Sequence, residues 1–173
     1  YYKKDYPEWS DRGDGPGAPV AVHMPNSPVI TTGKRDGSKI RLPNGNYLEE
    51  TASYYVMLGT KSGGFTPALI TMKSTQLNVS KKWNSMMKTI QIADGKGGFA
   101  IPPMHGVVYN LASTLQKNDK GSWYGWVVTQ DRILGQEDKT LYLSAKDFSG
   151  NVSKGTVQTK ADAEEKVKDS TPY

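Results

Sequence analysis

The chain has 173 residues, a formal net charge of +5 and a hydrophobic fraction of 36%, so it can fold as one domain with a real core. It contains no cysteine, which excludes disulfides, thiol catalysis and cysteine-based zinc sites. No segment approaches the ~20 consecutive apolar residues that span a bilayer, and no leader-like segment follows Tyr1. We therefore expect a soluble protein of the cytoplasm.

The first part of the chain predicts a loop followed by strands. Residues 10–37 are rich in glycine and proline, which favour turns over regular elements, so we expect a long loop there. Asn44-Gly45 is a dipeptide typical of hairpin turns, because both residues tolerate positive φ. Apolar and β-branched residues flank it and recur further on. The expected strand segments are 39–42, 47–48, 53–58 and 66–73.

A helical period follows the last of these strands. Apolar residues recur at steps of four, three and four, which places them on one face of a helix. Ser74 or Thr75 is in position to cap the start of this helix, and Asp94-Gly95 to end it. Trp83 lies on the apolar stripe, so we interpret it as a core residue. The stripe consists of Val79, Trp83, Met86 and Ile90.

Two more strands and a second helix complete the predicted domain. Residues 106–113 and 122–129 have strand character, and the second segment carries aromatic residues on both of its faces. Since a small core needs only one face, we expect either Trp123 or the pair Tyr124 and Trp126 to be exposed. A helix is expected at about 138–149. Residues 151–173 are polar and mildly acidic, and we expect a flexible C-terminal tail.

The order of these elements indicates a mainly β fold with helices. Three strands, a helix, two strands and a final helix give the order β-β-β-α-β-β-α. This is the connectivity of an OB-fold, a five-stranded, partly open barrel that binds oligonucleotides on one face. We therefore expect residues 1–150 to form a single OB-like nucleic-acid-binding domain. More than one segment of residues 1–42 could supply its first strand.

The charge pattern points to a polyanionic ligand. Between Thr51 and Asn118 the chain carries seven lysines and one acid, Asp94, interleaved with aromatic residues. Lysines suit phosphates and aromatic rings suit exposed bases, so the block favours single-stranded nucleic acid. A second interpretation stays open, in which the aromatic residues are core and the lysines are a solvated face. The candidate binding residues are Lys73, Lys81, Lys82, Lys88, Lys96, Tyr54, Tyr55, Tyr124 and Trp126.

Several short motifs resemble those of a known family. They are Ser74-Thr-Gln-Leu77, Ser80-Lys-Lys-Trp-Asn84, Met86-Met87, Gly121-Ser-Trp-Tyr-Gly-Trp126 and the early Glu8-Trp9, Arg12 and His23. Together they resemble tailed-bacteriophage proteins identified as single-stranded DNA-binding proteins, over most of residues 1–150. That family extends ahead of the position of Tyr1.

The resemblance implies an OB-like fold, sequence-tolerant binding of single-stranded DNA, and a role in phage replication or recombination. It places the protein in the cytoplasm of the infected bacterial host. Other phage replication or recombination proteins are its expected partners, and the acidic C-terminal tail is a candidate docking segment for them.

Catalytic patterns are weak in this sequence. His23 and His105 are the only histidines and are far apart, without zinc-ligand spacing. Glu49-Glu50 and Gln136-Glu-Asp138 offer carboxylates for Mg²⁺, but adjacent acids on a strand point in different directions. We expect no catalytic residue, metal or cofactor. The alternative to DNA binding is a non-enzymatic phage structural module or a carbohydrate-binding β module, neither of which needs the acid-poor block.

Overall fold

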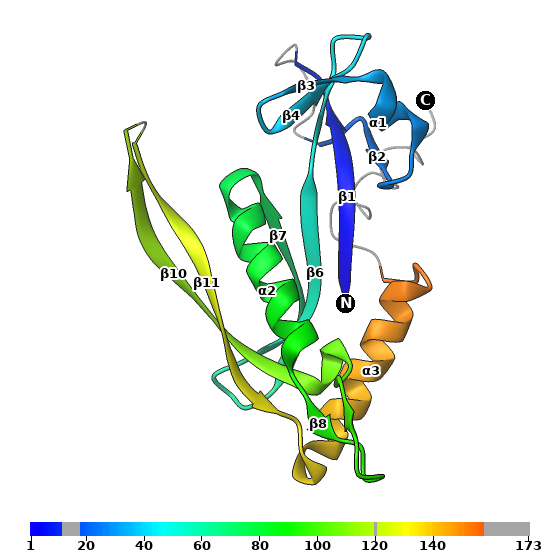
Figure 1. Cartoon of the computed structure of the whole chain (residues 1–173), viewed down its shortest axis with the longest axis vertical. Coiled ribbons are helices and arrows are strands. Elements are labelled where there is room, and N and C mark those ends of the chain that lie inside the picture. The colour runs from blue at the N-terminus through cyan, green and yellow to red at the C-terminus, as the bar shows by residue number, and fades with distance from the viewer. Residues whose placement is uncertain (12–17, 120, 158–173) are drawn as a thin grey trace, which may run out of the picture. The chain divides into compact units, whose positions relative to one another are not determined.

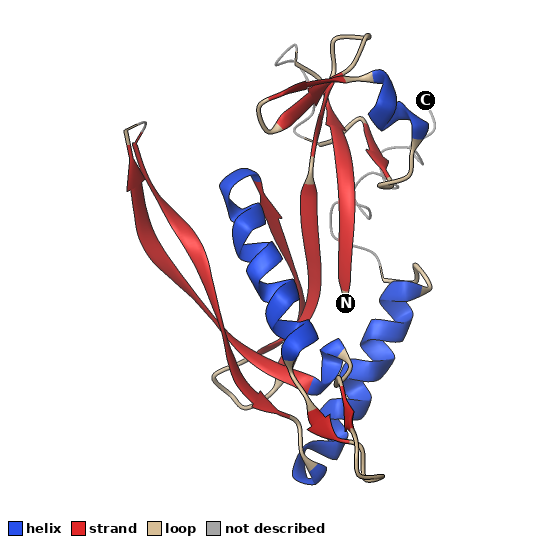
Figure 2. Ribbon diagram, viewed as in Figure 1, coloured by secondary structure: helices blue, strands red, loops and turns tan. Residues whose placement is uncertain are grey.

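The computed structural model describes residues 1–11, 18–119 and 121–157, and the chain divides into two compact units. Strands dominate the first unit, whereas the second combines strands with two long helices (Figures 1 and 2). The first unit contains residues 1–74 and the described residues from 150 onward, and the second contains residues 75–149.

Each unit has its own elements. The first holds β1 (Tyr2–Trp9), β2 (Ala21–His23), α1 (Pro28–Thr32), β3 (Lys34–Asp36), β4 (Lys39–Arg41), β5 (Tyr47–Glu49), β6 (Thr51–Gly59) and β7 (Phe65–Lys73). The second begins with α2 (Leu77–Thr89), β8 (Ile92–Ala93) and β9 (Phe99–Ala100), and continues with β10 (Val107–Asn118) and β11 (Gly121–Ile133). The last helix is α3 (Lys139–Ser153).

One antiparallel sheet organises the first unit. Its order is β3-β4-β5-β1-β6-β7, with β2 paired to β1. Strand β1 pairs with β6 through its first half and with β2 and β5 through its second half. One face carries a core in which Leu48 is fully buried, and α1 packs Val29 and Ile30 against it. The other buried residues of this cluster are Tyr6, Ile40 and Leu42.

The predicted hairpin at Asn44-Gly45 is confirmed, since the turn joins β4 to β5. Gly45 adopts a φ of +88°, which is the left-handed region that glycine enters without a steric penalty. The side-chain oxygen of Asn44 accepts a hydrogen bond of 3.0 Å from the backbone N–H of Asn46. The sequence thus fixes this turn locally.

The expected loop at residues 10–37 needs correction, because its described part contains β2, α1 and β3. Ser27 caps α1 by accepting a hydrogen bond from the N–H of Val29, and Pro28 occupies the first turn. Proline and glycine here begin and end short elements. The C-terminal tail begins later than expected, since residues 151–153 belong to α3. Residues 158–173 of that tail lie outside the described part of the chain.

The helix predicted from the apolar stripe is confirmed as α2, and Trp83 is buried as expected. Its ends differ from the prediction. A short 3-10 turn over residues 74–76 precedes it, Gln76 occupies the N-cap position, and no side chain caps it. The helix ends at Thr89, well before Asp94-Gly95. Those two residues instead form part of the turn that joins β8 to β9. The final helix, predicted at about 138–149, is confirmed as α3.

The chain is a mixed, mainly β protein with helices, but the expected five-stranded, partly open OB-fold barrel is wrong. Over the described residues the antiparallel sheets stay separate, and none closes into a barrel. In the part of the chain that the structure describes, strands β10 and β11 pair only with each other, from Val107↔Ile133 to Asn118↔Gly121. The sequence pattern located both strands, although it missed the second half of β10, but such a pattern carries no information about strand partners.

Candidate nucleic-acid interface

Helix α2 presents three lysines that are free of neighbouring acids. Lys81, Lys82 and Lys88 are exposed, while Trp83 and Met87 on the other face are buried. The sequence holds no acid between Lys73 and Asp94. Within the described residues, none of these three lysines forms an ion pair. The helix is therefore a source of positive potential with little local neutralisation.

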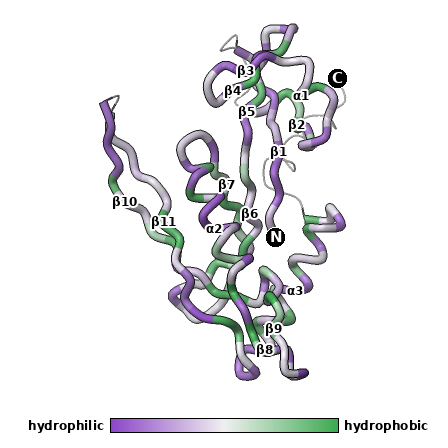
Figure 3. Tube along the Cα trace, in the orientation of Figure 1, coloured by the Kyte–Doolittle hydropathy of each residue, from purple (hydrophilic) through white to green (hydrophobic). Residues whose placement is uncertain are grey.

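Strands β10 and β11 form a long two-stranded ribbon, here called the arm, which runs beside α2 (Figure 1). Cross-strand pairing puts Leu115 and Tyr124 on one face, followed by Ser113 and Trp126. The exposed fractions are 73% for Tyr124, 60% for Leu115 and 37% for Trp126. The tip of the arm is hydrophilic and its middle hydrophobic (Figure 3). The exposed aromatic pair is thus Tyr124 and Trp126, one of the two expected outcomes.

A side-chain hydrogen bond attaches the arm to the start of α2. The backbone N–H of Trp126 donates to Oε1 of Gln76 at 3.0 Å. The Gln76 side chain lies against Gly125, where a Cβ would come within 2.8 Å of its Nε2 and 2.5 Å of Nε2 of Gln116. A side chain at this position would displace the ends of both glutamine side chains, so Gly125 leaves room for the bond between Gln76 and the arm.

An aromatic contact joins α2 to the base of the arm. The rings of Trp83 and Tyr109 meet edge to face, with centroids 5.5 Å apart. Burial raises the pKa of Tyr109 to about 12, so its hydroxyl stays protonated at neutral pH. The two contacts hold the arm against α2, so the exposed rings and the lysines belong to neighbouring elements.

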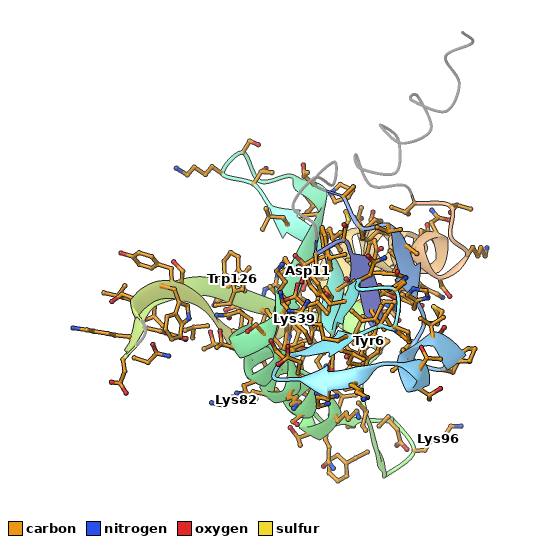
Figure 4. The ribbon with its side chains drawn as sticks, turned by 90° about the horizontal axis from the view of Figure 1, so that it is seen from above. Tyr6, Asp11, Lys39, Lys82, Lys96 and Trp126 are labelled. Carbon is orange, nitrogen blue, oxygen red and sulfur yellow. The ribbon has the colours of Figure 1, made fainter. Side chains whose placement is uncertain are left out.

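Lys96 lies elsewhere in the second unit. It is exposed in the turn between β8 and β9, and Figure 4 shows it well apart from Lys82 and Trp126. Asp94 shapes this turn, since its Oδ1 accepts hydrogen bonds from the N–H groups of Lys96 and Gly98 at 2.8 and 2.9 Å. Both hydrogen bonds lower the pKa of Asp94, and the bond from Lys96 has the larger effect. Lys96 does not join the surface of α2 and the arm.

Three further candidates belong to the first unit. Tyr54 is only 2% exposed and packs on the ring of Tyr2, with centroids 5.1 Å apart, so it offers no face to a base and the prediction is corrected. Tyr55 is half-buried beside Tyr1. Lys73 is exposed but ion-paired with Glu49 at 3.1 Å. Neighbouring strand positions face opposite sides of a sheet, which separates Tyr54 from Tyr55.

Sequence reasoning missed part of the surface. Gln76 stands in the sequence only as a member of the motif Ser74-Thr-Gln-Leu77, and its bond to the arm joins residues 50 positions apart. Leu115 and Lys117 were missed because the polar residues after Ser113 concealed the second half of β10. The strand alternation continues through them, with Leu115 opposite Tyr124, and this period was the available signal.

Three of the four carboxylates considered for a metal have other partners, namely Glu49, Glu50 and Asp138. Glu49 pairs with Lys73 and Glu50 with Lys4, while Asp138 is held by Arg132 and by the N–H of Gly135. The Arg132 contact lowers the pKa of Asp138. Within the described residues, no three histidines or acids gather in a metal-binding arrangement. None of the described helices is long and apolar enough to cross a membrane.

A family model described as Pam3 phage gp34-like protein matches residues 1–158. No curated protein and no solved structure shows significant similarity to the chain.

Proposed function

The chain belongs to the Pam3 phage gp34-like protein family, and from this premise we propose that it binds single-stranded DNA through α2 and the arm. The observation that carries the proposal is the bond between Trp126 and Gln76. It fixes two exposed rings beside a helix with three unpaired lysines. The resemblance of the motifs to phage single-stranded DNA-binding proteins supports the same function.

Each component of the surface has a separate task. Lysines on α2 neutralise phosphates, which gives affinity that depends on salt but not on sequence. Tyr124 and Trp126 offer ring faces on which bases stack, and stacking tolerates any base because every base has a π-face. The result is sequence-tolerant binding without a chemical step. Such a protein protects or organises single strands during phage replication or recombination, in the cytoplasm of the infected host.

The direct test measures binding to a labelled oligo(dT) over a range of salt concentrations. Phosphate contacts to Lys81, Lys82 and Lys88 should contribute about −2 to the slope of log affinity against log salt, at about −0.7 per contact. The double variant Lys81→Ser/Lys82→Ser should flatten the slope by about 1.4 and weaken binding at low salt. The control Lys139→Ser/Lys146→Ser removes the same charge from exposed positions of α3.

The control should keep the wild-type slope. A wild-type protein that does not bind, or equal slopes for the two double variants, would reject the proposal.

A structural role in the virion is the second candidate. The observation that favours it is the exposed apolar side chain of Leu115 beside Tyr124, since a protein partner would bury both. The oligo(dT) titration separates the two functions. A structural or carbohydrate-binding module would show no salt-dependent binding of DNA, and its arm variants would lose assembly or sugar binding instead.

A further inference from the structure

One face of the sheet in the first unit carries cations and aromatic rings side by side. The pairing registers Lys34↔Arg41, Arg41↔Tyr47 and Tyr47↔Trp9 place four residues in a row across β3, β4, β5 and β1. Directly paired residues of an antiparallel sheet point to the same face. The row therefore runs from two cations to two aromatic rings.

The rings of this row lie under cations. Nζ of Lys39 stands 3.7 Å from the centroid of the Tyr47 ring, and Cζ of Arg41 is 5.7 Å from the same centroid. At the other end, Nζ of Lys73 is 5.6 Å from the centroid of Trp9. A cation over a ring is attracted by the ring quadrupole but keeps its full charge. These contacts orient the cations without neutralising them.

The cations of the face outnumber its carboxylates. Among the described residues, Lys34 and Lys39 form no ion pair, whereas Arg41 pairs with Asp11 and Asp36 and Lys73 pairs with Glu49. The side chain of Arg41 is 40% exposed, and those of its partners Asp11 and Asp36 are 48% and 65% exposed. Ion pairs this exposed are weak and exchange readily for other anions, such as phosphates.

We propose that this face is a second contact surface for the same single-stranded DNA, in which Lys34 and Lys39 bind backbone phosphates. The inference rests on the proposed function and assigns the first unit a part in it. Tyr47 is a positioning residue that holds Lys39. Lys73, the one candidate lysine of the first unit, belongs to this surface rather than to the surface of α2 and the arm. Lys39 and Asp11 are labelled in Figure 4.

A matched pair of variants tests the surface. Lys34→Gln/Lys39→Gln removes the two unpaired cations, and Lys61→Gln/Lys154→Gln removes equal charge from other exposed positions of the first unit. Both are titrated with oligo(dT) of about 40 nucleotides, longer than the ~4–16 nucleotides bound by one small domain. We expect the first variant to flatten the salt slope by about 1.4 and the second to leave it unchanged.

Two substitutions at Tyr47 test whether its ring positions Lys39. Tyr47→Phe keeps a ring under Lys39 and should bind like the wild type, while Tyr47→Leu should weaken binding at low salt. Thermal unfolding followed by circular dichroism identifies any variant that fails to fold. In that case Lys34→Gln alone, on the fully exposed strand β3, should flatten the slope by about 0.7.

The outcomes separate the two proposals. If the wild type binds and Lys81→Ser/Lys82→Ser weakens binding, but the variants of Lys34 and Lys39 match their control, the second surface is rejected and the proposed function stands. If the wild type does not bind oligo(dT), both are rejected.

Discussion

The backbone N–H of Trp126 donates its hydrogen bond to the side chain of Gln76, at the position where α2 begins. A glutamine side chain at this position would ordinarily point into solvent. Here it holds the strand that carries the exposed rings against the start of α2. Because binding energy rises when a surface is ordered before its ligand arrives, this bond is expected to contribute to affinity as well as to stability.

Gln76→Leu removes the acceptor and should release the arm from α2. We expect a loss of about 1 kcal/mol in the free energy of unfolding, as for a typical neutral hydrogen bond. Hydrogen exchange of the Trp126 amide should accelerate, and binding of oligo(dT) should weaken. Gln76→Glu keeps an acceptor oxygen and is the control for amide exchange. An unchanged exchange rate in Gln76→Leu would show that the bond does not hold the arm in solution.

Tyr124 supplies the most exposed ring of the arm, so its removal tests stacking directly. Tyr124→Ala should weaken oligo(dT) binding by about 1–3 kcal/mol, roughly 5- to 150-fold, with little change in stability. Tyr124→Phe keeps the ring and should bind like the wild type. Fluorescence anisotropy at fixed salt measures the affinities. Equal affinity of the alanine and phenylalanine variants would remove Tyr124 from the interface.

Trp83 should behave in the opposite way, because its side chain is buried against Tyr109. Trp83→Ala should lower the free energy of unfolding by about 3–5 kcal/mol, and Trp83→Phe by less. Urea denaturation followed by circular dichroism measures both. A fully stable Trp83→Ala protein that loses DNA binding would place the indole at the ligand rather than in the core.

Glu8 gives the fold a dependence on pH. Hydrogen bonds from Asn46, His23 and Asn44, in that order of size, hold the pKa of this carboxyl below its ordinary value of 4.5. The folded state therefore gains stability from the charged form above pH 4.5, and this gain is lost as the pH falls through the lower folded pKa.

Glu8→Gln removes the titrating group. Its stability deficit relative to the wild type should be largest at neutral pH and should shrink in acid. Glu137→Gln, an exposed carboxylate, is the control. Urea midpoints between neutral pH and pH 3 measure the difference, and a constant deficit over that range would contradict the assignment to Glu8.

Periodicity predicted individual elements well in this chain. The stripe around Trp83 identified α2, alternation identified β7 and most of β11, and strand-rich composition identified β6 and the first half of β10. Strand β1 was missed because it contains Pro7 and several charged residues, which ordinarily argue against a central strand. Pro7 is accommodated opposite Val22 in the short pairing with β2. The long-range partners of β1, not its own composition, make it a strand.

The candidate site shows the same limit. Tyr54 and Tyr124 both lie on strands and look equivalent in sequence, yet one is 2% and the other 73% exposed. Their difference comes from packing, which no local pattern encodes. The lysines of α2 were predictable because a helix with one apolar face must present its polar residues to solvent. The row from Lys34 to Trp9 was not, since it joins four strands through their registers.

The unpaired outer edges of the arm affect how the protein behaves at high concentration. Strands β10 and β11 pair only with each other within the described residues, so most backbone groups along their outer edges are open to another strand. Open edges beside apolar side chains are the usual starting points of strand-to-strand aggregation. Lys117 and Asp119 near the tip oppose this with charge. The protein should therefore become prone to self-association at high concentration, and a ligand that covers the arm should suppress it.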